Sequence, residues 1–276
     1  MGSPLGTDDL VLSHFTLGRA YPIEGRIEAA VAGGYSAIGL YVREVERVDL
    51  GRLGDLLDEA RLQLSDLEVV AGWGSGPAAL EHHAFALADR FGGRCLQAVG
   101  PYDGTIDDAG RSFGRLCDRA ADHGLVVALE PLPFTNIPDI ATALEVVERA
   151  GRPNGGLCVD IWHHTRVGED RAVLRALPPE RIHCVQISDG PLAPPTPDLA
   201  DYKDDCLRHR VPPGEGEMDA VGVVAALLDA GATVPWSVEV CSESVTEANG
   251  VEHARRCADG TRSVLAAARS TVPGSR

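Results

Sequence analysis

Short apolar runs alternate with longer amphipathic segments along this chain of 276 residues, and the alternation limits the possible folds more than any other feature. Runs that are apolar throughout are typical of strands buried on both faces of a parallel sheet. The intervening segments, such as 23–34 and 140–152, have helical spacing, and several end in glycine, which terminates helices. Eight apolar runs of 5 to 7 residues occur, at 11–17, 36–42, 67–73, 95–100, 125–130, 156–160, 183–188 and 236–240.

Eight strand–helix units in about 270 residues match the count and length of a (β/α)8 TIM barrel. A doubly wound sheet would need fewer strands and a glycine-rich phosphate loop after the first strand, and no GxGxxG motif follows run 11–17. Because no low-complexity linker divides the chain, we predict a single α/β domain over 1–276, with the barrel at about 10–270. The proline-rich stretch 189–219 predicts a loop over the active face, with a lid as one role.

Composition excludes several classes of protein. A hydrophobic content of 44% rules out a disordered or fibrous chain. The formal charge of −16 argues against binding to nucleic acid or to anionic membranes. No apolar run approaches the roughly 18 residues of a spanning helix, and the first residues lack the pattern of a secretion signal, so we expect a cytoplasmic protein. The seven cysteines form no CxxC pair, which argues against a disulfide framework and a structural zinc cluster.

Polar residues stand at or near the ends of the last four apolar runs. They are Glu130, Asp160, Gln186 and Glu239. In a TIM barrel the chemistry lies at the C-terminal ends of the strands, and a charge buried there needs a counter-charge or a metal. One acidic residue in such a place is usually a helix cap or part of a surface ion pair. Four oxygen-bearing residues on adjacent strands instead indicate a site for Mg²⁺ or Mn²⁺, because zinc prefers His and Cys.

Five sequence strings carry a resemblance to a known family: LEPLPF (129–134), VDIWHH (159–164), VQISD (185–189), PPGEGEMD (212–219) and SVEVCSE (237–243). In this order they resemble the xylose-isomerase-like TIM-barrel superfamily of sugar phosphate isomerases and epimerases. The resemblance implies one divalent metal, Mn²⁺ or Mg²⁺ with Co²⁺ or Zn²⁺ as alternatives, on Glu130, Asp160, Gln186 and Glu239. It also implies that the two glutamates form an acid/base pair. Many members have His where this chain has Gln186, and a Gln there resembles the 3-dehydroshikimate dehydratases.

The resemblance implies further site residues. His163 matches a substrate-binding or acid/base histidine of the family, and His164 is its rival. The family places an arginine before PPGEG to hold a substrate oxygen; we prefer Arg210, and Arg208 is the alternative.

His14 lies within the first apolar run, and Trp73 ends the third. They could line the substrate pocket, and packing in the aromatic core is the competing interpretation. The second run, 36–42, lacks the acidic residue that many family members place near its end. This change would suit a less polar or ring-shaped substrate.

These features predict an enzyme that removes a proton next to a carbonyl, with the metal stabilising the enediolate. Our first hypothesis is an isomerase or epimerase of a sugar-like or cyclic polyol ketone. The alternative is a metal-dependent lyase, such as a dehydroshikimate or inosose dehydratase or an enzyme that cleaves C–O or C–C bonds of a glycoside-like compound. A non-catalytic barrel that binds a ligand is the third hypothesis. The expected partner is a small carbohydrate-like or cyclic keto substrate, and a homodimer stays open.

Overall fold

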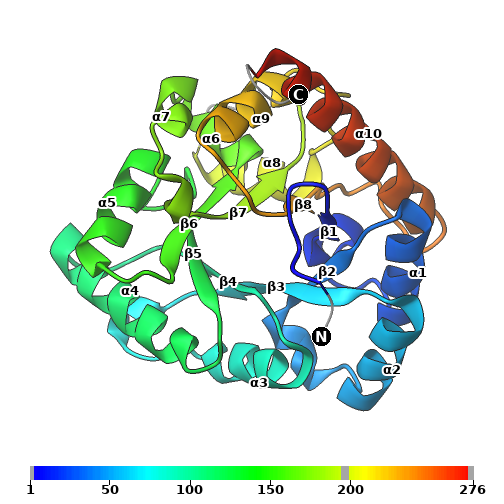
Figure 1. Ribbon diagram of the computed structural model, residues 1–276, viewed down its shortest axis with the longest axis horizontal. Coiled ribbons are helices and arrows are strands. Elements are labelled where there is room, and N and C mark those ends of the chain that lie inside the picture. Colours follow the sequence, from blue (N-terminus) through cyan, green and yellow to red (C-terminus); the bar gives the residue numbers. More distant parts are fainter. Residues whose placement is uncertain (1–2, 194–198, 273–276) are drawn as a thin grey trace.

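Eight parallel strands close into one barrel, in the order in which they follow one another along the chain (Figure 1). The computed structural model describes residues 3–193 and 199–272. The strands are β1 (Leu10–Leu12), β2 (Ala37–Tyr41), β3 (Gln63–Val70), β4 (Cys95–Val99), β5 (Val126–Glu130), β6 (Gly155–Asp160), β7 (Ile182–Ile187) and β8 (Trp236–Val238). Pairing of β1 with β8 closes the barrel, so no strand edge is left exposed among them. The predicted (β/α)8 TIM barrel is confirmed.

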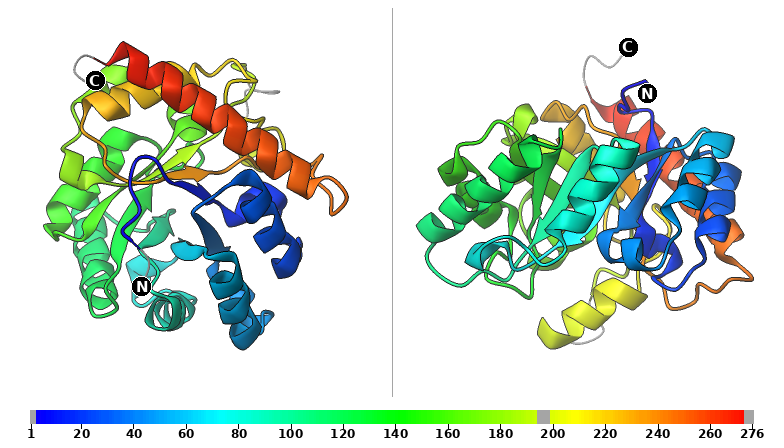
Figure 2. Two further views of the ribbon diagram at one scale, coloured as in Figure 1. Left: turned by 45° about the vertical axis from the view of Figure 1, so that its right-hand side comes forward. Right: turned by 90° about the horizontal axis from the view of Figure 1, so that it is seen from below.

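Helices surround the barrel and bury its outer face (Figures 1 and 2). They are α1 (Ile23–Gly33), α2 (Leu50–Ala60), α3 (Glu81–Phe91), α4 (Ile106–Ala121), α5 (Ile140–Ala150), α6 (Ile161–Val167), α7 (Arg171–Arg175), α8 (Leu199–Arg208), α9 (Ala220–Asp229) and α10 (Gly250–Thr271). Local chemistry sets their ends. Thr105 and Asp108 form a capping box at the start of α4, and Gly151 ends α5 in the left-handed conformation.

The prediction of one strand over 11–17 is wrong. Only Leu10–Leu12 pairs as β1, and His14–Leu17 forms a 3-10 helix, η1. The Ser13 hydroxyl accepts a hydrogen bond from the Phe15 amide at 3.2 Å and so caps this helix. Because η1 is as apolar as a strand, its sequence does not reveal the change. Similarly, β3 begins at Gln63, four residues before the predicted run, and ends before Trp73.

The stretch 189–219 contains a helix, α8, in the part that the structure describes; its residues 194–198 lie outside that part. Figure 2 (right) shows α8 projecting from the mouth of the barrel opposite to the chain termini. The Arg166 guanidinium on α6 holds it, through hydrogen bonds of 3.0 and 2.8 Å to the Asp205 carboxylate on α8. Both side chains are buried, so this ion pair fixes α8 against the barrel.

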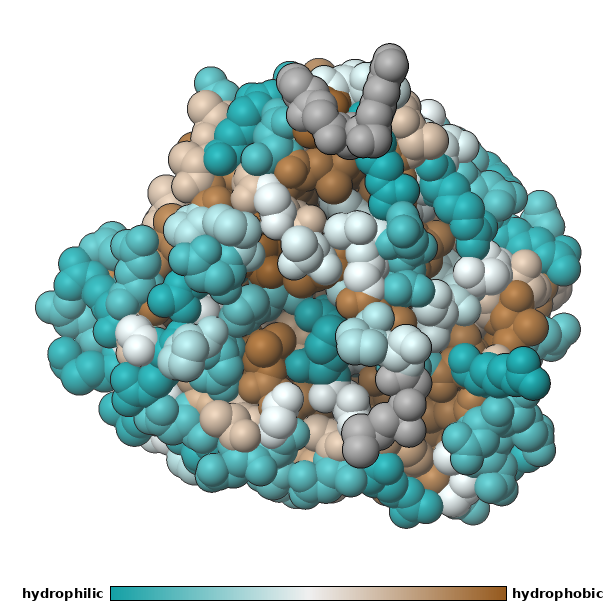
Figure 3. Space-filling model, viewed as in Figure 1, coloured by the Kyte–Doolittle hydropathy of each residue, from teal (hydrophilic) through white to brown (hydrophobic). Residues whose placement is uncertain are grey.

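Hydrophilic residues cover most of the barrel face shown in Figure 3, and hydrophobic residues appear among them in smaller groups. Across the described ranges, none of the helices combines the length and the apolar character that crossing a bilayer requires.

Candidate active site

Four strand ends bring together the polar residues predicted to hold a metal. Glu130 ends β5, Asp160 ends β6, Gln186 lies one residue before the end of β7, and Glu239 directly follows β8. The register pairs Asp160 with Gln186 and Gln186 with Ser237, so these side chains lie at one level of the barrel. All four are buried, with exposed fractions of 5%, 1%, 1% and 6%. The structure therefore places the predicted set at one mouth of the barrel.

Asp160 both ends a strand and starts a helix. Its Oδ1 accepts hydrogen bonds from the backbone amides of Trp162 at 2.6 Å and His163 at 3.2 Å, which caps α6. This bonding fixes the carboxylate and leaves Oδ2 for other partners. The same cap sets the first turn of α6, which carries His163 over the strand ends.

Three ligand atoms gather within 4.8 Å of one another, from Glu130, Asp160 and His163. His163 Nε2 lies 3.2 Å from Glu130 Oε1 and 3.9 Å from Asp160 Oδ2. Two carboxylates and one imidazole at such spacing suit a divalent cation. The sequence predicts His163 to bind substrate or act as acid/base and does not count it as a metal ligand, so this cluster enlarges the set of candidate ligands.

Gln186 joins this cluster to Glu239. Its amide Nε2 donates a hydrogen bond of 3.1 Å to Glu239 Oε1, while its Oε1 accepts one of 3.1 Å from the Cys158 thiol. The amide nitrogen, not the oxygen, thus faces the carboxylate. For Gln186 to serve as the predicted oxygen ligand, its amide group would have to rotate by half a turn.

Arg210 provides the positive charge of the site. Its Nη1 donates to Asp160 Oδ2 at 2.7 Å and lies 3.3 Å from Glu239 Oε2. Three buried carboxyl groups face this one guanidinium, so their oxygens outnumber the positive charges available to pair with them, which suits a divalent cation. The residues present therefore fit a metal, although chelation by both Asp160 and Glu239 requires Arg210 to withdraw from between them.

Burial and neighbouring charges separate the pKa values of the three carboxyls. Burial raises the pKa of Glu130, although His163 opposes the shift. Burial also raises the pKa of Glu239 well above its usual range, against the effect of Arg210. At Asp160 burial acts in the same direction, but the Arg210 guanidinium and His163 together outweigh it and the pKa is lowered. Asp160 thus stays ionised, whereas Glu130 and Glu239 can exchange protons nearer to neutral pH.

A second glutamate lies behind Glu239 and was not singled out from the sequence. Ser13 Oγ donates to Glu68 Oε2 at 3.0 Å and to Glu239 Oε1 at 3.3 Å, so it connects the two carboxyl groups. Glu68 is fully buried in β3, and a Cβ at Gly39 would collide with its Oε1. A charged residue inside an apolar run was the signal that could have identified it.

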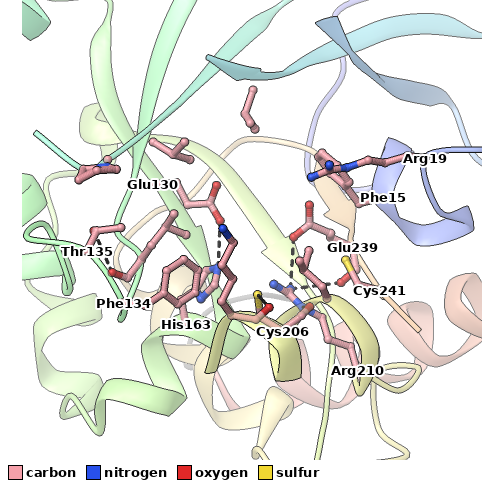
Figure 4. Close-up of a pocket in the computed structure, with 17 residues that line it drawn as sticks. Phe15, Arg19, Glu130, Phe134, Thr135, His163, Cys206, Arg210, Glu239 and Cys241 are labelled. Carbon is pink, nitrogen blue, oxygen red and sulfur yellow. Dashed lines mark hydrogen bonds and ion pairs between the residues drawn. The ribbon is translucent and has the colours of Figure 1, made fainter. Parts of the chain in front are cut away.

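The site opens into a pocket of about 580 Å³. Figure 4 shows Glu130 and His163 on one side of it and Glu239, Phe15 and Arg19 on the other. Most of the remaining wall is apolar and includes Phe15, Val69, Val99, Leu132, Phe134 and Leu207. A pocket with an apolar wall and a few convergent polar groups is the usual form of a small-molecule site.

The structure separates the two rivals among the histidines. His163 lines the pocket, whereas the Nδ1 of His164 lies 3.3 Å from the Glu169 carboxylate and the residue takes no part in the pocket wall. Asp189 accepts hydrogen bonds from the amides of Gly214 and Met218, so it holds the turn after α8.

Three residues expected to bind substrate lie outside the pocket wall. Arg208 is half exposed and pairs with Asp204 at 2.6 Å. The Trp73 indole is buried, stacks on Tyr102 and donates to the Val99 carbonyl at 3.1 Å. His14 begins η1, and its buried ring lies on the side of a different surface hollow. Trp73 thus packs in the aromatic core, as the competing interpretation expected.

His14 gives a testable dependence of stability on pH. Burial, together with Arg26, lowers its pKa from 6.5 to about 2, so it stays neutral in the folded protein. Below about pH 6.5 the unfolded chain binds a proton that the folded chain does not, and stability falls by up to about 1.4 kcal/mol per pH unit. Between about pH 7 and pH 5.5, the free energy of unfolding should therefore fall by roughly 1 kcal/mol less in His14→Asn than in the wild type. Urea unfolding at the two pH values measures this difference. The exposed His82→Asn is the control, and equal losses in both variants would contradict the assignment.

A family model described as xylose isomerase-like TIM barrel matches residues 27–260. The chain belongs to this family. This TIM-barrel chain is 32% identical over 157 residues to a 3-dehydroshikimate dehydratase of Pseudomonas aeruginosa and 29% identical over 170 residues to one of Pseudomonas putida. The alignments include 55% and 61% of the chain but 23% and 25% of the dehydratases, so the chain matches about a quarter of the length of these relatives.

Several solved structures share the fold. The IolI protein with a bound zinc atom superimposes with a TM-score of 0.78 at 18% identity, covering 94% of this chain and 98% of that one. A D-allulose 3-epimerase of Methylomonas sp. in complex with D-allulose gives a TM-score of 0.72 at 18% identity, covering 95% and 99%. The relatives with named activities are thus enzymes that act on small molecules.

Proposed function

We propose that this protein is a metal-dependent dehydratase of a cyclic hydroxyketone, of the class to which 3-dehydroshikimate belongs. The observation that carries the proposal is the pair Glu130 and Glu239, both buried and both lining one pocket on opposite sides (Figure 4). Two carboxyl groups with raised pKa values can serve as base and acid on one bound ring.

Glu130 and Asp160, with His163 or with Glu239 and Gln186, would hold the metal. When bound, a divalent cation would polarise the ketone oxygen and so acidify the neighbouring C–H bond. Mn²⁺ and Mg²⁺ suit the oxygen donors, and His163 also makes Zn²⁺ or Co²⁺ acceptable.

The residues of the chain perform the proton transfers. One glutamate accepts the proton from the carbon next to the ketone, and the hydroxyl on the following carbon leaves as water with a proton from the acid. A C=C bond forms between the two carbons, and the only products are the unsaturated ring and water. Asp160, which stays ionised, is held by Arg210 and by the α6 amides and therefore keeps His163 in place.

Three observations favour dehydration over epimerisation. Both curated relatives are dehydratases. Near the end of β7 this chain has Gln186, where many epimerases of the family have His. The pocket wall is mostly apolar, which suits a ring better than an open polyhydroxy ketose. An epimerase or isomerase, our first expectation, shares the initial proton abstraction and stays the second candidate because glutamates stand on both sides of the pocket.

The test is a direct assay of the Mn²⁺-loaded protein with 3-dehydroshikimate, and with inososes and keto-sugars in parallel. Dehydration of 3-dehydroshikimate yields an aromatic ring, 3,4-dihydroxybenzoate, so ultraviolet absorbance should rise and NMR should show the aromatic protons. Incorporation of deuterium from solvent into a keto-sugar, without a rise in absorbance, would overturn the dehydratase in favour of the epimerase. Absence of both reactions would reject the two candidates for the substrates tested.

A further inference from the structure

Lys203 is the only lysine of the sequence, beside 24 arginines, and it lines the candidate active site. It lies on α8, one turn before Cys206 and Leu207, which line the same pocket. Lys203 forms no ion pair with any of the side chains that the structure describes, which are those of 3–193 and 202–272. A lysine side chain is long and flexible, and it carries a compact charge that can follow a ligand.

Arg19 is a second cation at this pocket. It follows η1, and its guanidinium carbon lies 5.4 Å from the ring centre of Phe15 and 5.2 Å from that of Tyr41. These cation–π contacts orient the group without using its N–H donors. Among the side chains that the structure describes, those of 3–193 and 202–272, no carboxylate lies within ion-pair distance of Arg19. Figure 4 shows Arg19 beside Phe15, on the side of the pocket where Glu239 lies.

These two cations differ from the charged groups around them. Arg208 on the same helix pairs with Asp204 and Glu243. Arg210, which we expected to hold a substrate oxygen, pairs in this structure with Asp160 and Glu239. The chain has a formal charge of −16, yet these two cations at one pocket have no carboxylate partner among the described side chains. They therefore provide a place for an anionic group of a ligand.

We propose that Lys203 and Arg19 bind a carboxylate of the substrate, so that the site selects cyclic keto acids over neutral keto-sugars. The ring chemistry in this statement rests on the proposed dehydratase function, while the anion subsite itself depends only on the two cations. Arg19 presents a planar fork that suits a carboxylate, and Lys203 approaches from α8 as a movable point charge. The cation pair would act on substrate binding, not on the proton transfers.

The experiment compares two ring ligands that differ only by the carboxylate, 3,4-dihydroxybenzoate and catechol, by isothermal titration of the Mn²⁺-loaded protein. We expect the wild type to bind 3,4-dihydroxybenzoate at least about 10-fold more tightly, since hydrogen bonds to charged groups contribute about 10- to 100-fold in affinity. Lys203→Met and Arg19→Met should each lose most of this preference, and Lys203→Arg should keep part of it. Arg208→Met is the matched control and should retain the full preference.

Chemical modification gives an independent readout. Trinitrobenzenesulfonate reacts with amines, so in this chain it can label Lys203 and the terminal amine, which peptide mass spectrometry separates. We expect 3,4-dihydroxybenzoate, but not catechol, to slow the labelling of Lys203. Protection by inorganic phosphate alone would overturn the assignment to a carboxylate.

The outcomes separate this subsite from the proposed function. If no substrate is dehydrated but the preference for the anion depends on Lys203 and Arg19, the dehydratase fails and the subsite stands. If 3-dehydroshikimate is dehydrated and Lys203→Met and Arg19→Met keep the wild-type KM and preference, the subsite fails and the dehydratase stands. Equal binding of both rings by the wild type also rejects the subsite.

Discussion

Replacing Glu239 by Gln is expected to reduce kcat by about 10²- to 10⁴-fold, the usual contribution of a positioned acid or base. The amide keeps the size of the side chain but can neither accept a proton nor balance a cation. Because burial raises the pKa of Glu239 well above its usual range, the folded metal-free protein gains nothing from its charge. We therefore expect Glu239→Gln to unfold at a temperature no lower than the wild type when no metal is added.

Measurement of the same variant with Mn²⁺ separates a catalytic defect from a folding defect. A ligand that binds only the folded state raises its stability, so the wild type should melt at a higher temperature with Mn²⁺, and Glu239→Gln should show a smaller shift. The exposed Glu243, which pairs with Arg208 outside the pocket, provides the control variant Glu243→Gln. Wild-type activity together with an unchanged Mn²⁺ shift in Glu239→Gln would remove Glu239 from the site.

Strand positions were largely readable from the sequence because strands buried on both faces need continuous apolar residues. The run 125–130 corresponds to β5 almost residue for residue. At 11–17 the prediction was wrong, because a 3-10 helix buried against the barrel is as apolar as a strand and the Ser13 cap leaves little trace in the sequence. The start of β3 was also misplaced, since Leu64 continues the apolar spacing of Leu57 and Ala60 in the preceding helix.

The sequence predicts where the residues of the site lie along the strands, but not which atoms contact one another. The strand ends of a barrel converge, so the sequence alone predicts Glu130 and Asp160 at one mouth. Which atom of Gln186 faces Glu239 depends on the Cys158 thiol below it, which a linear pattern does not record. The position of Arg210 depends in the same way on the packing of the segment that follows α8.

For Trp73 the sequence predicts the place near the end of β3 but does not decide between a role in the pocket wall and one in the core. A large aromatic residue just beyond a strand suits a pocket wall and a core equally well. Its burial is decided by Tyr102 and Phe113, which belong to later elements of the chain and pack on the indole ring. Only the three-dimensional arrangement distinguishes the two roles.

Replacing Arg210 by Met should lower the free energy of unfolding by about 3–5 kcal/mol near neutral pH, because it leaves the buried, ionised Asp160 without its counter-charge. The Arg210 side chain is 2% exposed and lies between Asp160 and Glu239. Arg208→Met removes an exposed arginine two residues away, so its effect should stay within about 0.5 kcal/mol. Urea unfolding of the two variants and the wild type measures the difference.

Low pH and a bound metal should each reduce the loss of stability caused by Arg210→Met. Arg210 lowers the pKa of Asp160 in the folded protein, so the stability it contributes is present above the ordinary Asp pKa and is lost as pH falls through the lowered one. The wild type and Arg210→Met should therefore converge in stability at acid pH. A divalent cation that takes the place of the guanidinium should stabilise Arg210→Met more than the wild type. If Mn²⁺ stabilised both proteins equally, Arg210 and the cation would not compete for the same carboxylates, and the proposed ligand set containing Asp160 and Glu239 would have to be abandoned.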